Sequence, residues 1–200
     1  KKLGVQVEIQ QMAFDSLIAA LNANKVDMVI SGVNPTEERK KAVDFSDVYY
    51  TSKGIFVVNK DSEEIKSVAD LKNKKIGVQK GSTYETYAKE QLKMDDKNIQ
   101  ALTDVPSLLQ DLKNKKIDAV LIPDDVAKIA MNKYTDIKIS TFTADNDPEA
   151  TGMAIAFKKG KNDSNKELLE QVNAVIKEIQ DQKAFEKELD KYAKVAAQSE

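Results

Sequence analysis

Residues 29–50, VISGVNPTEERKKAVDFSDVYY, decide how the rest of the chain is interpreted. The segment opens with an apolar run typical of a buried strand, turns at Gly32 and Asn34, and enters a short helix at Thr36. That helix carries Arg39. A guanidinium one turn inside a helix, beside the free backbone N–H groups of the turn, can bind a carboxylate through paired hydrogen bonds. The segment therefore predicts a carboxylate site.

Arg39 also has a more ordinary interpretation. An arginine that follows Thr-Glu-Glu is usually a solvated helix residue that pairs with a neighbouring acid. A resemblance favours the carboxylate site instead. The string SGVNPTEERKKAVDFSDVYY resembles a segment of the extracytoplasmic polar amino acid binding proteins of ABC importers. Their pattern runs Ser-Gly-x-Thr-x-Thr-x-Glu-Arg and then Val-Asp-Phe-Ser-x-x-Tyr-Tyr.

The composition suits a soluble protein with a substantial core. The 200 residues are 41% hydrophobic and 32% charged, which provides one substantial core or two small ones under a charged surface. The formal net charge is −2 and the lysines are spread along the chain, which argues against a nucleic acid partner. The chain has no Cys and no His, which excludes thiol catalysis, imidazole acid–base chemistry and the usual zinc ligands. We therefore predict no catalytic residue, no metal and no cofactor.

The first third of the chain predicts a βαβ unit. Val5–Ile9 alternates apolar and polar residues, as a strand with one buried face does. Phe14–Leu21 has helical spacing of its apolar residues, and Val26–Ile30 is a second strand. This strand ends at Ser31 and Gly32, and open parallel sheets bind ligands at the carboxyl ends of their strands. The predicted carboxylate site therefore lies where a ligand is expected.

A second candidate site follows the predicted strand Lys75–Gln79. Gly81 leads into Ser82 and Thr83, and Glu85 completes a capping box that predicts the helix Thr83–Leu92. A helix that begins after a glycine turn can bind an anion, although a capped helix without ligand is the more common case. The resemblance implies that Ser82 and Thr83 form the second clamp on the ligand carboxylate. It also implies that Gln79 touches the ligand side chain.

Asp124 follows the predicted strand Ile117–Ile122. Relatives usually carry an acidic residue here that holds the α-ammonium group of the ligand, but this chain has Pro123 at that position. Asp124 is the nearest carboxylate, and an ammonium in a partly dry cleft needs a paired charge. An exposed helix-capping aspartate is the alternative interpretation.

The remaining sequence predicts a regular succession of strands and helices. The further elements expected are the strands Gly54–Val58 and Ile99–Leu102, the return strand Thr151–Gly160, and the helices Ser67–Leu71, Pro106–Leu112 (opened by Asp104), Asn162–Gln180 and Phe185–Tyr192.

The resemblance spans nearly the whole chain and implies the two-lobed periplasmic-binding-protein type II fold. Each lobe is then a mixed, mainly parallel sheet flanked by helices. The expected lobes are 1–52 plus 150–200 and 53–149, joined by a hinge near Thr51–Gly54 and Glu149–Thr151. The implied ligand-binding residues are Phe14, Ser31, Gly32, Asn34 and Arg39 in the first lobe and Gln79, Ser82, Thr83 and Asp124 in the second.

One departure from the family concerns the beginning of the chain. Family members have a further strand and helix before the equivalent of Lys1. A first lobe without them would expose apolar surface and a sheet edge, so dimerisation or segment exchange is possible. Neither a signal peptide nor a membrane span is visible, and any export signal or lipid-bearing cysteine is expected upstream of Lys1.

The function implied is capture of a free L-amino acid by hinge closure for the membrane permease of an ABC importer. The location implied is extracytoplasmic, with a lipid anchor. Two alternatives stay open. The same fold occurs as a sensor module of signalling receptors, and it also occurs in enzymes, although nothing here marks the buried carboxyl that a general acid requires.

Overall fold

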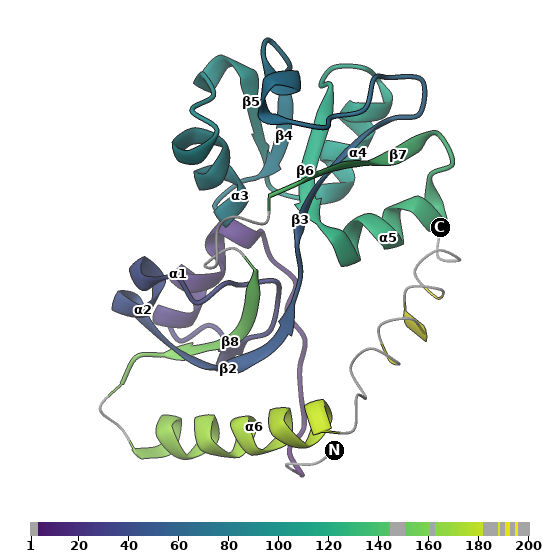
Figure 1. Cartoon of the computed structure of the whole chain (residues 1–200). Coiled ribbons are helices and arrows are strands. Elements are labelled where there is room, and N and C mark those ends of the chain that lie inside the picture. Colours follow the sequence, from purple (N-terminus) through teal and green to yellow (C-terminus); the bar gives the residue numbers. More distant parts are fainter. Residues whose placement is uncertain are drawn as a thin grey trace. The chain divides into compact units, whose positions relative to one another are not determined.

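The computed structural model describes residues 4–144, 151–160 and 163–181, together with Glu188, Lys191, Tyr192 and Val195. Contacts divide these residues into two compact units. The first contains residues 4–51, 152–160, 163–181 and Glu188, and the second contains residues 52–144 with Thr151, Lys191, Tyr192 and Val195. Both are α/β (Figure 1). The interpretation of these units as two ligand-binding lobes stays a prediction.

The first unit is built on three antiparallel strands in the order β1-β8-β2. Helices α1 and α2 lie on one side of this sheet and α6 lies across the other (Figure 1). The elements are α1 (Leu17–Asn22, preceded by a 3-10 turn over Phe14–Ser16), β1 (Met28–Val29), α2 (Glu37–Ala42), β2 (Val43–Thr51), β8 (Gly152–Lys158) and α6 (Asp163–Asp181).

Strand β8 contributes to two cores because its alternate residues point to opposite faces. Ala156 packs with Leu21 of α1 and Val43 of β2. Ile155 and Phe157 pack on the other face against α6. The return strand and the amphipathic helix predicted after it are therefore confirmed, although Asn162 at the predicted start of that helix lies outside the described residues.

The predicted strand Val5–Ile9 is wrong. Residues 4–13 form no helix or strand, and Val5, Val7 and Ile9 are 59%, 74% and 90% exposed. An alternating strand is stable only when a neighbour pairs with its backbone and covers its apolar face. In the part of the chain that the structure describes, no strand pairs with this segment. The βαβ unit is consequently absent, and this sheet is antiparallel rather than mainly parallel.

The second unit contains a five-stranded sheet in the order β5-β4-β6-β3-β7. Strand β4 runs parallel to β5 and β6, whereas β3 runs antiparallel to β6 and β7. The strands are β3 (Gly54–Asn59), β4 (Ile76–Gln79), β5 (Ile99–Leu102), β6 (Ala119–Pro123) and β7 (Ile137–Thr143). The helical segments are α3 (Thr83–Thr86), α4 (Val105–Lys113), α5 (Asp124–Lys133) and 3-10 turns over Val68–Leu71 and Asp96–Asn98.

Both faces of this sheet are buried, which explains why β3 is apolar at almost every position. Phe56 and Val58 belong to a core shared with α3, whereas Ile55 and Val57 belong to a core shared with α4 and α5. The continuous run Gly54–Val58 predicts such a strand, and the prediction is confirmed.

The helix predicted over Thr83–Leu92 is only partly α-helical. After α3 the chain continues as a π-helical turn over Tyr87–Gln91, and the N–H of Leu92 donates to the carbonyl of Tyr87 at 3.0 Å. Most of the predicted helix Phe185–Tyr192 and part of the second predicted hinge segment lie outside the described residues. Across the described ranges, every helix is too short or too polar to cross a membrane.

Candidate functional site

The first group of predicted site residues surrounds the turn after β1. The N–H of Val33 donates to the carbonyl of Ser31 at 2.7 Å, and the N–H of Thr36 donates to the carbonyl of Asn34 at 2.9 Å. The Thr36 hydroxyl caps α2 by accepting from the N–H of Arg39 at 3.2 Å. These local bonds place Arg39 in the first turn of α2, as the sequence predicts.

The guanidinium of Arg39 is held against neighbouring groups of the same unit. Nη1 donates to the carbonyl oxygen of Asn34 at 3.0 Å, and Cζ lies 5.7 Å from the centre of the Phe14 ring. Burial lowers the pKa of the Arg39 guanidinium below its ordinary value, and the Glu38 carboxylate partly offsets this effect. A half-buried guanidinium placed in this way differs from the solvated surface arginine of the alternative interpretation.

The other predicted residues of this group have structural partners. The Tyr49 hydroxyl donates to the carbonyl of Ser31 at 2.9 Å. The side chain of Asn34 is buried, and its Nδ2 donates to the carbonyl of Gly152 in β8 at 2.7 Å. A Cβ on Gly32 would lie 3.5 Å from Met153 Cε, an ordinary contact, so crowding does not require glycine there. The structure thus gathers the five predicted residues of the first unit around one turn.

The second group lies at the start of α3. The Ser82 hydroxyl donates to the carbonyl of Gln79 at 2.6 Å and accepts from the N–H of Glu85 at 3.3 Å. The Glu85 carboxylate accepts from the N–H of Gly81 at 2.8 Å instead of that of Ser82. The predicted capping box is therefore wrong in its second bond, because the N–H of Ser82 already donates to Gln79.

Gln79 and Thr83 occupy different environments in this group. Nε2 of Gln79 donates to the carbonyl of Thr103 at 3.1 Å, which links the end of β4 to the end of β5. Thr83 is buried, with 7% of its surface exposed. Strands β4 and β6 are parallel neighbours with Val78 opposite Leu121. Their carboxyl ends therefore meet at one edge of the sheet, where Asp124 follows β6.

Asp124 has partners for both carboxylate oxygens. Oδ1 accepts from the N–H of Lys53 at 3.1 Å, and Oδ2 lies 2.9 Å from Nζ of Lys128 one turn later in α5. This arrangement fits the alternative interpretation, in which Asp124 stabilises the beginning of α5. The neighbouring Asp125 was not predicted as a site residue, although its Oδ1 is buried and has no hydrogen-bond partner among the described residues. The two adjacent acids at a helix start were the available signal.

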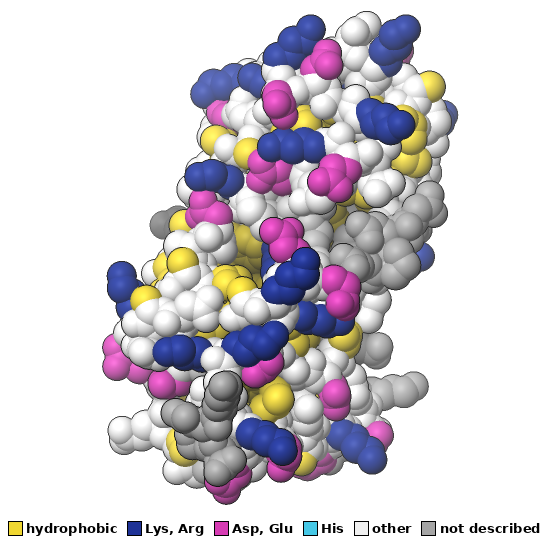
Figure 2. All heavy atoms as spheres, turned by 90° about the vertical axis from the view of Figure 1, so that its left-hand side faces the viewer, with side chains coloured by type: hydrophobic (Ala, Val, Ile, Leu, Met, Phe, Trp, Pro, Cys, Tyr) yellow, Lys and Arg dark blue, Asp and Glu magenta, His cyan; other side chains and the backbone are white. Residues whose placement is uncertain are grey.

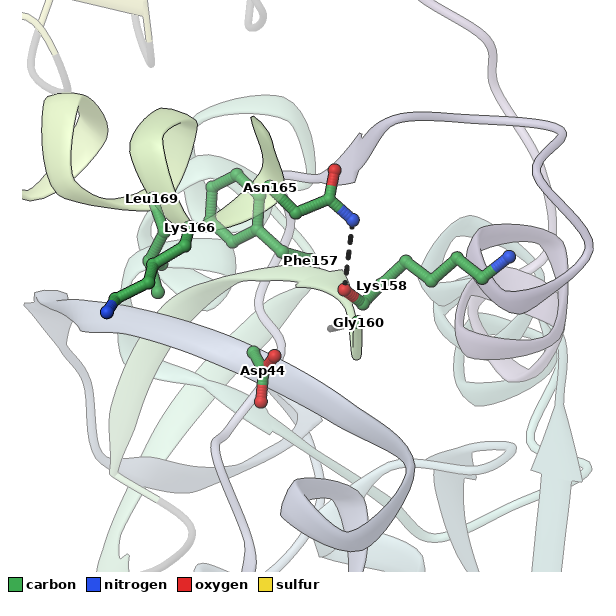
Figure 3. Close-up of a pocket in the computed structure, with 7 residues that line it drawn as sticks. All are labelled: Asp44, Phe157, Lys158, Gly160, Asn165, Lys166 and Leu169. Carbon is green, nitrogen blue, oxygen red and sulfur yellow. Dashed lines mark hydrogen bonds between the residues drawn. The ribbon is translucent and has the colours of Figure 1, made fainter. Parts of the chain in front are cut away.

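A small cavity in the first unit contains none of the predicted residues. Its volume is about 140 Å³, and it is lined by Asp44, Phe157, Lys158, Gly160, Asn165, Lys166 and Leu169. Asn165 Nδ2 donates to the carbonyl of Lys158 at 3.3 Å, and the Lys158 ammonium points away from the other lining side chains (Figure 3). Its lining residues come from β2, β8, α6 and the segment that follows β8.

Charged side chains of both signs are mixed on the face that Figure 2 shows. Lysine and arginine side chains alternate with acidic ones over the face in view (Figure 2). In the described part of the chain, no three Asp or Glu residues gather as a metal site would require.

Comparison with known proteins gives a consistent result. Residues 1–195 match the model of the bacterial extracellular solute-binding proteins, family 3. The arginine-binding extracellular protein ArtP of Bacillus subtilis is 41% identical over 192 residues, which cover 94% of this chain and 71% of that protein. The L-cystine-binding protein TcyJ of Escherichia coli is 35% identical over 90% of this chain and 65% of its own length.

A solved structure extends the likeness to three dimensions. It is an amino acid ABC transporter substrate-binding protein from Streptococcus pneumoniae bound to L-arginine. The alignment has a TM-score of 0.86 at 32% identity, and it covers 96% of this chain and 78% of that one.

Proposed function

Because the chain belongs to family 3 of the bacterial extracellular solute-binding proteins, we propose that it captures a free amino acid for the permease of an ABC importer. The observation that carries this proposal is the position of Arg39, half-buried between Phe14 and the Asn34 carbonyl. A guanidinium oriented before binding loses little freedom when it takes up a carboxylate. Arg39 therefore binds the ligand α-carboxylate.

The other predicted residues complete the binding of the amino acid. Ser31, Gly32 and Asn34 supply polar contacts in the first unit, and Phe14 lines the side-chain pocket. In the second unit, Ser82 and Thr83 help to bind the ligand carboxylate, and Gln79 contacts the side chain of the ligand. The chain passes between the units near residues 51 and 152, and ligand contacts from both units favour their closure. Small-angle X-ray scattering should then show a smaller radius of gyration with ligand.

L-arginine is the first ligand to test. Arginine is named as the ligand of the Bacillus protein and is bound in the Streptococcus structure. Another relative is named for L-cystine, so the polar amino acid must be determined by experiment. Titration calorimetry with each of the twenty amino acids and cystine identifies it directly.

Substitution of Arg39 tests the site itself. Arg39→Ala should weaken binding by at least ~2 kcal/mol, because the ligand carboxylate loses its buried charged partner. Lys40→Ala is the matched control, since Lys40 lies on the same helix and forms an exposed pair with Glu37. Unaltered affinity in a folded Arg39→Ala protein would refute the carboxylate site.

The family and its relatives are solute-binding proteins, and in this proposal the chain binds its amino acid without converting it. A sensing role uses the same ligand chemistry as transport. Incubation of the chain with the identified amino acid, followed by analysis of the products, shows whether the amino acid is only bound or also converted.

The proposed location is outside the cytoplasm, with a lipid anchor in the full-length protein. Mass spectrometry of the protein from its own membranes tests the anchor.

We also propose that a second copy of the chain associates through residues 5–9. Val5, Val7 and Ile9 are exposed and alternate with polar residues, and β1 lies at the edge of its sheet. A segment with this alternation can add as a strand to an open strand edge, with its apolar side chains on one face.

A further inference from the structure

Two hydrogen bonds fasten the turn after β1 to strand β8. The N–H of Ala154 donates to the carbonyl of Val33 at 2.9 Å, and Nδ2 of Asn34 donates to the carbonyl of Gly152 at 2.7 Å. Asn34 is only 5% exposed, and a hydrogen bond is stronger in such buried surroundings than in water. The side-chain amide of Asn34 is therefore a buried anchor of the turn.

The local sequence explains why a side chain makes the second of these bonds. Asn34 is followed by Pro35, which has no backbone N–H and cannot donate to β8. The side-chain amide of Asn34 supplies the same kind of donor one position earlier. The family pattern has threonine at this position, and the donor of threonine is a hydroxyl one bond closer to the backbone. The pattern therefore does not imply this anchor.

The backbone of the same residue contacts Arg39. The carbonyl oxygen of Asn34 accepts from Nη1 of Arg39 at 3.0 Å and from the N–H of Thr36 at 2.9 Å. One carbonyl oxygen can accept both bonds because it has two lone pairs. The direction of this carbonyl depends on where the anchor holds the turn, and the carbonyl in turn holds one side of the guanidinium.

The orientation of this guanidinium matters because Arg39 is the only arginine of the 200 residues. No other side chain of the sequence offers the planar fork of donors that matches a carboxylate. A guanidinium that is already oriented loses less freedom on binding than a mobile one. Whatever fixes its direction therefore contributes to ligand affinity.

We propose that Asn34 is a positioning residue of the carboxylate site. Its side chain holds the turn on β8, and its carbonyl thereby holds Arg39 in the direction that a ligand carboxylate requires. This inference rests on the function proposed above. The polar contact that Asn34 offers the amino acid then comes from its backbone, because its side-chain amide is bound to Gly152.

Titration calorimetry of Asn34→Ala and Asn34→Leu with L-arginine tests the inference. Both changes remove the donor to Gly152, and leucine keeps roughly the shape of the asparagine side chain. Loss of the anchor should weaken arginine binding at least about 5-fold in each folded variant. Normal binding by a folded variant would overturn the inference.

Ser46→Ala is the matched control. Ser46 is also buried, and its Oγ accepts from the N–H of Ile155 in β8 at 2.9 Å. Its removal costs the same strand a hydrogen bond at a position outside the turn. Ser46→Ala should lower the Tm as Asn34→Ala does, but it should bind L-arginine normally. An equal loss of affinity in both variants would mean that Asn34 acts only through the stability of the sheet, which contradicts a positioning role.

A double variant separates positioning from direct contact with the ligand. If Asn34 acts through Arg39, adding Asn34→Ala to Arg39→Ala should cost no further affinity. If the side chain of Asn34 touches the ligand, the two losses add and the inference is wrong. NMR titration measures the Kd of variants that bind too weakly for calorimetry.

NMR of the ligand-free chain provides a readout that stability alone does not change. Because Arg39 is the only arginine, its Nε–H group gives a single side-chain signal of this kind in a proton–nitrogen correlation spectrum. The order parameter of this group should be that of a rigid group, about 0.85, in the unaltered chain and in Ser46→Ala, and should fall below about 0.6 in Asn34→Ala. An ordered Arg39 in folded Asn34→Ala, or a mobile Arg39 in the unaltered chain, would overturn the inference.

The same spectra separate this inference from the proposed function. If the unaltered chain binds no amino acid but Arg39 loses its order in Asn34→Ala alone, the proposed function fails and the role of Asn34 in holding Arg39 stands. If the chain binds L-arginine and Arg39 is equally ordered with and without the Asn34 side chain, only the inference fails.

Discussion

The guanidinium carbon of Arg39 lies 5.7 Å from the centre of the Phe14 ring. The first turn of α2 therefore lies beside the 3-10 turn that precedes α1. A cation over an aromatic ring is attracted by the electrons of the ring face. Phe14 therefore orients Arg39.

Phe14→Leu should weaken amino acid binding while the protein stays folded. The cation–π contact contributes about 0.5–2 kcal/mol, which corresponds to a roughly 2- to 30-fold rise in Kd. Calorimetry gives the Kd, and circular dichroism checks the fold. Phe142→Leu is the control, because Phe142 stacks on Phe56 in the other unit. If both variants lose affinity equally, Phe14 has no specific role in the site.

Local interactions explain which parts of the site the sequence predicts well. The Thr36 cap and the placement of Arg39 depend on residues within one helical turn, and both agree with the sequence pattern. Val5–Ile9 shows where prediction from sequence fails. Alternating apolar and polar residues indicate that a segment can form a strand, but they do not show whether a neighbouring strand is present to pair with it.

Gly54→Ala should destabilise the second unit. A Cβ there would lie 2.6 Å from Cε1 of Tyr84 and 2.9 Å from Cβ of Ala144, closer than atoms pack in proteins. Overpacking of this kind costs about 1–3 kcal/mol, measurable as a lower urea midpoint. Gly32→Ala is the matched control, because its new methyl group would make only an ordinary contact. Equal midpoints for the two variants would show that Tyr84 moves aside without cost.

Glu85 should stabilise the turn before α3 in a pH-dependent way. Burial acts to raise the pKa of Glu85, but hydrogen bonds from Lys89 and the N–H of Gly81 outweigh it and leave the pKa below its ordinary value of 4.5. A carboxyl with a lower pKa in the folded state stabilises it above the unfolded pKa. That contribution disappears as the pH falls through the folded pKa.

Glu85→Gln should therefore lower the free energy of unfolding at pH 7, by at most about 1 kcal/mol because the pair with Lys89 is partly exposed. The difference from the unaltered chain should shrink as the pH drops below 4.5, where the carboxylate becomes protonated. Urea unfolding at several pH values gives both quantities. Glu90→Gln, an exposed change in the next turn, should show no such trend. If the difference in unfolding free energy did not change with pH, the effect of Glu85→Gln would come from the altered shape of the side chain and not from its lost charge.

Ile9→Lys should reduce self-association without changing stability. Ile9 is 90% exposed, so a charge at this position should disturb little of the packing among the described residues. If residues 5–9 pair with the edge of β1 in a second copy, however, the lysine would be buried against apolar neighbours and oppose the pairing. Light scattering during gel filtration should then show mass above that of the monomer for the unaltered chain and monomer mass for Ile9→Lys. Gln6→Lys changes a polar residue of the same segment, and the protein with this change should still associate. A monomer mass for the unaltered chain at every concentration would contradict association through this segment.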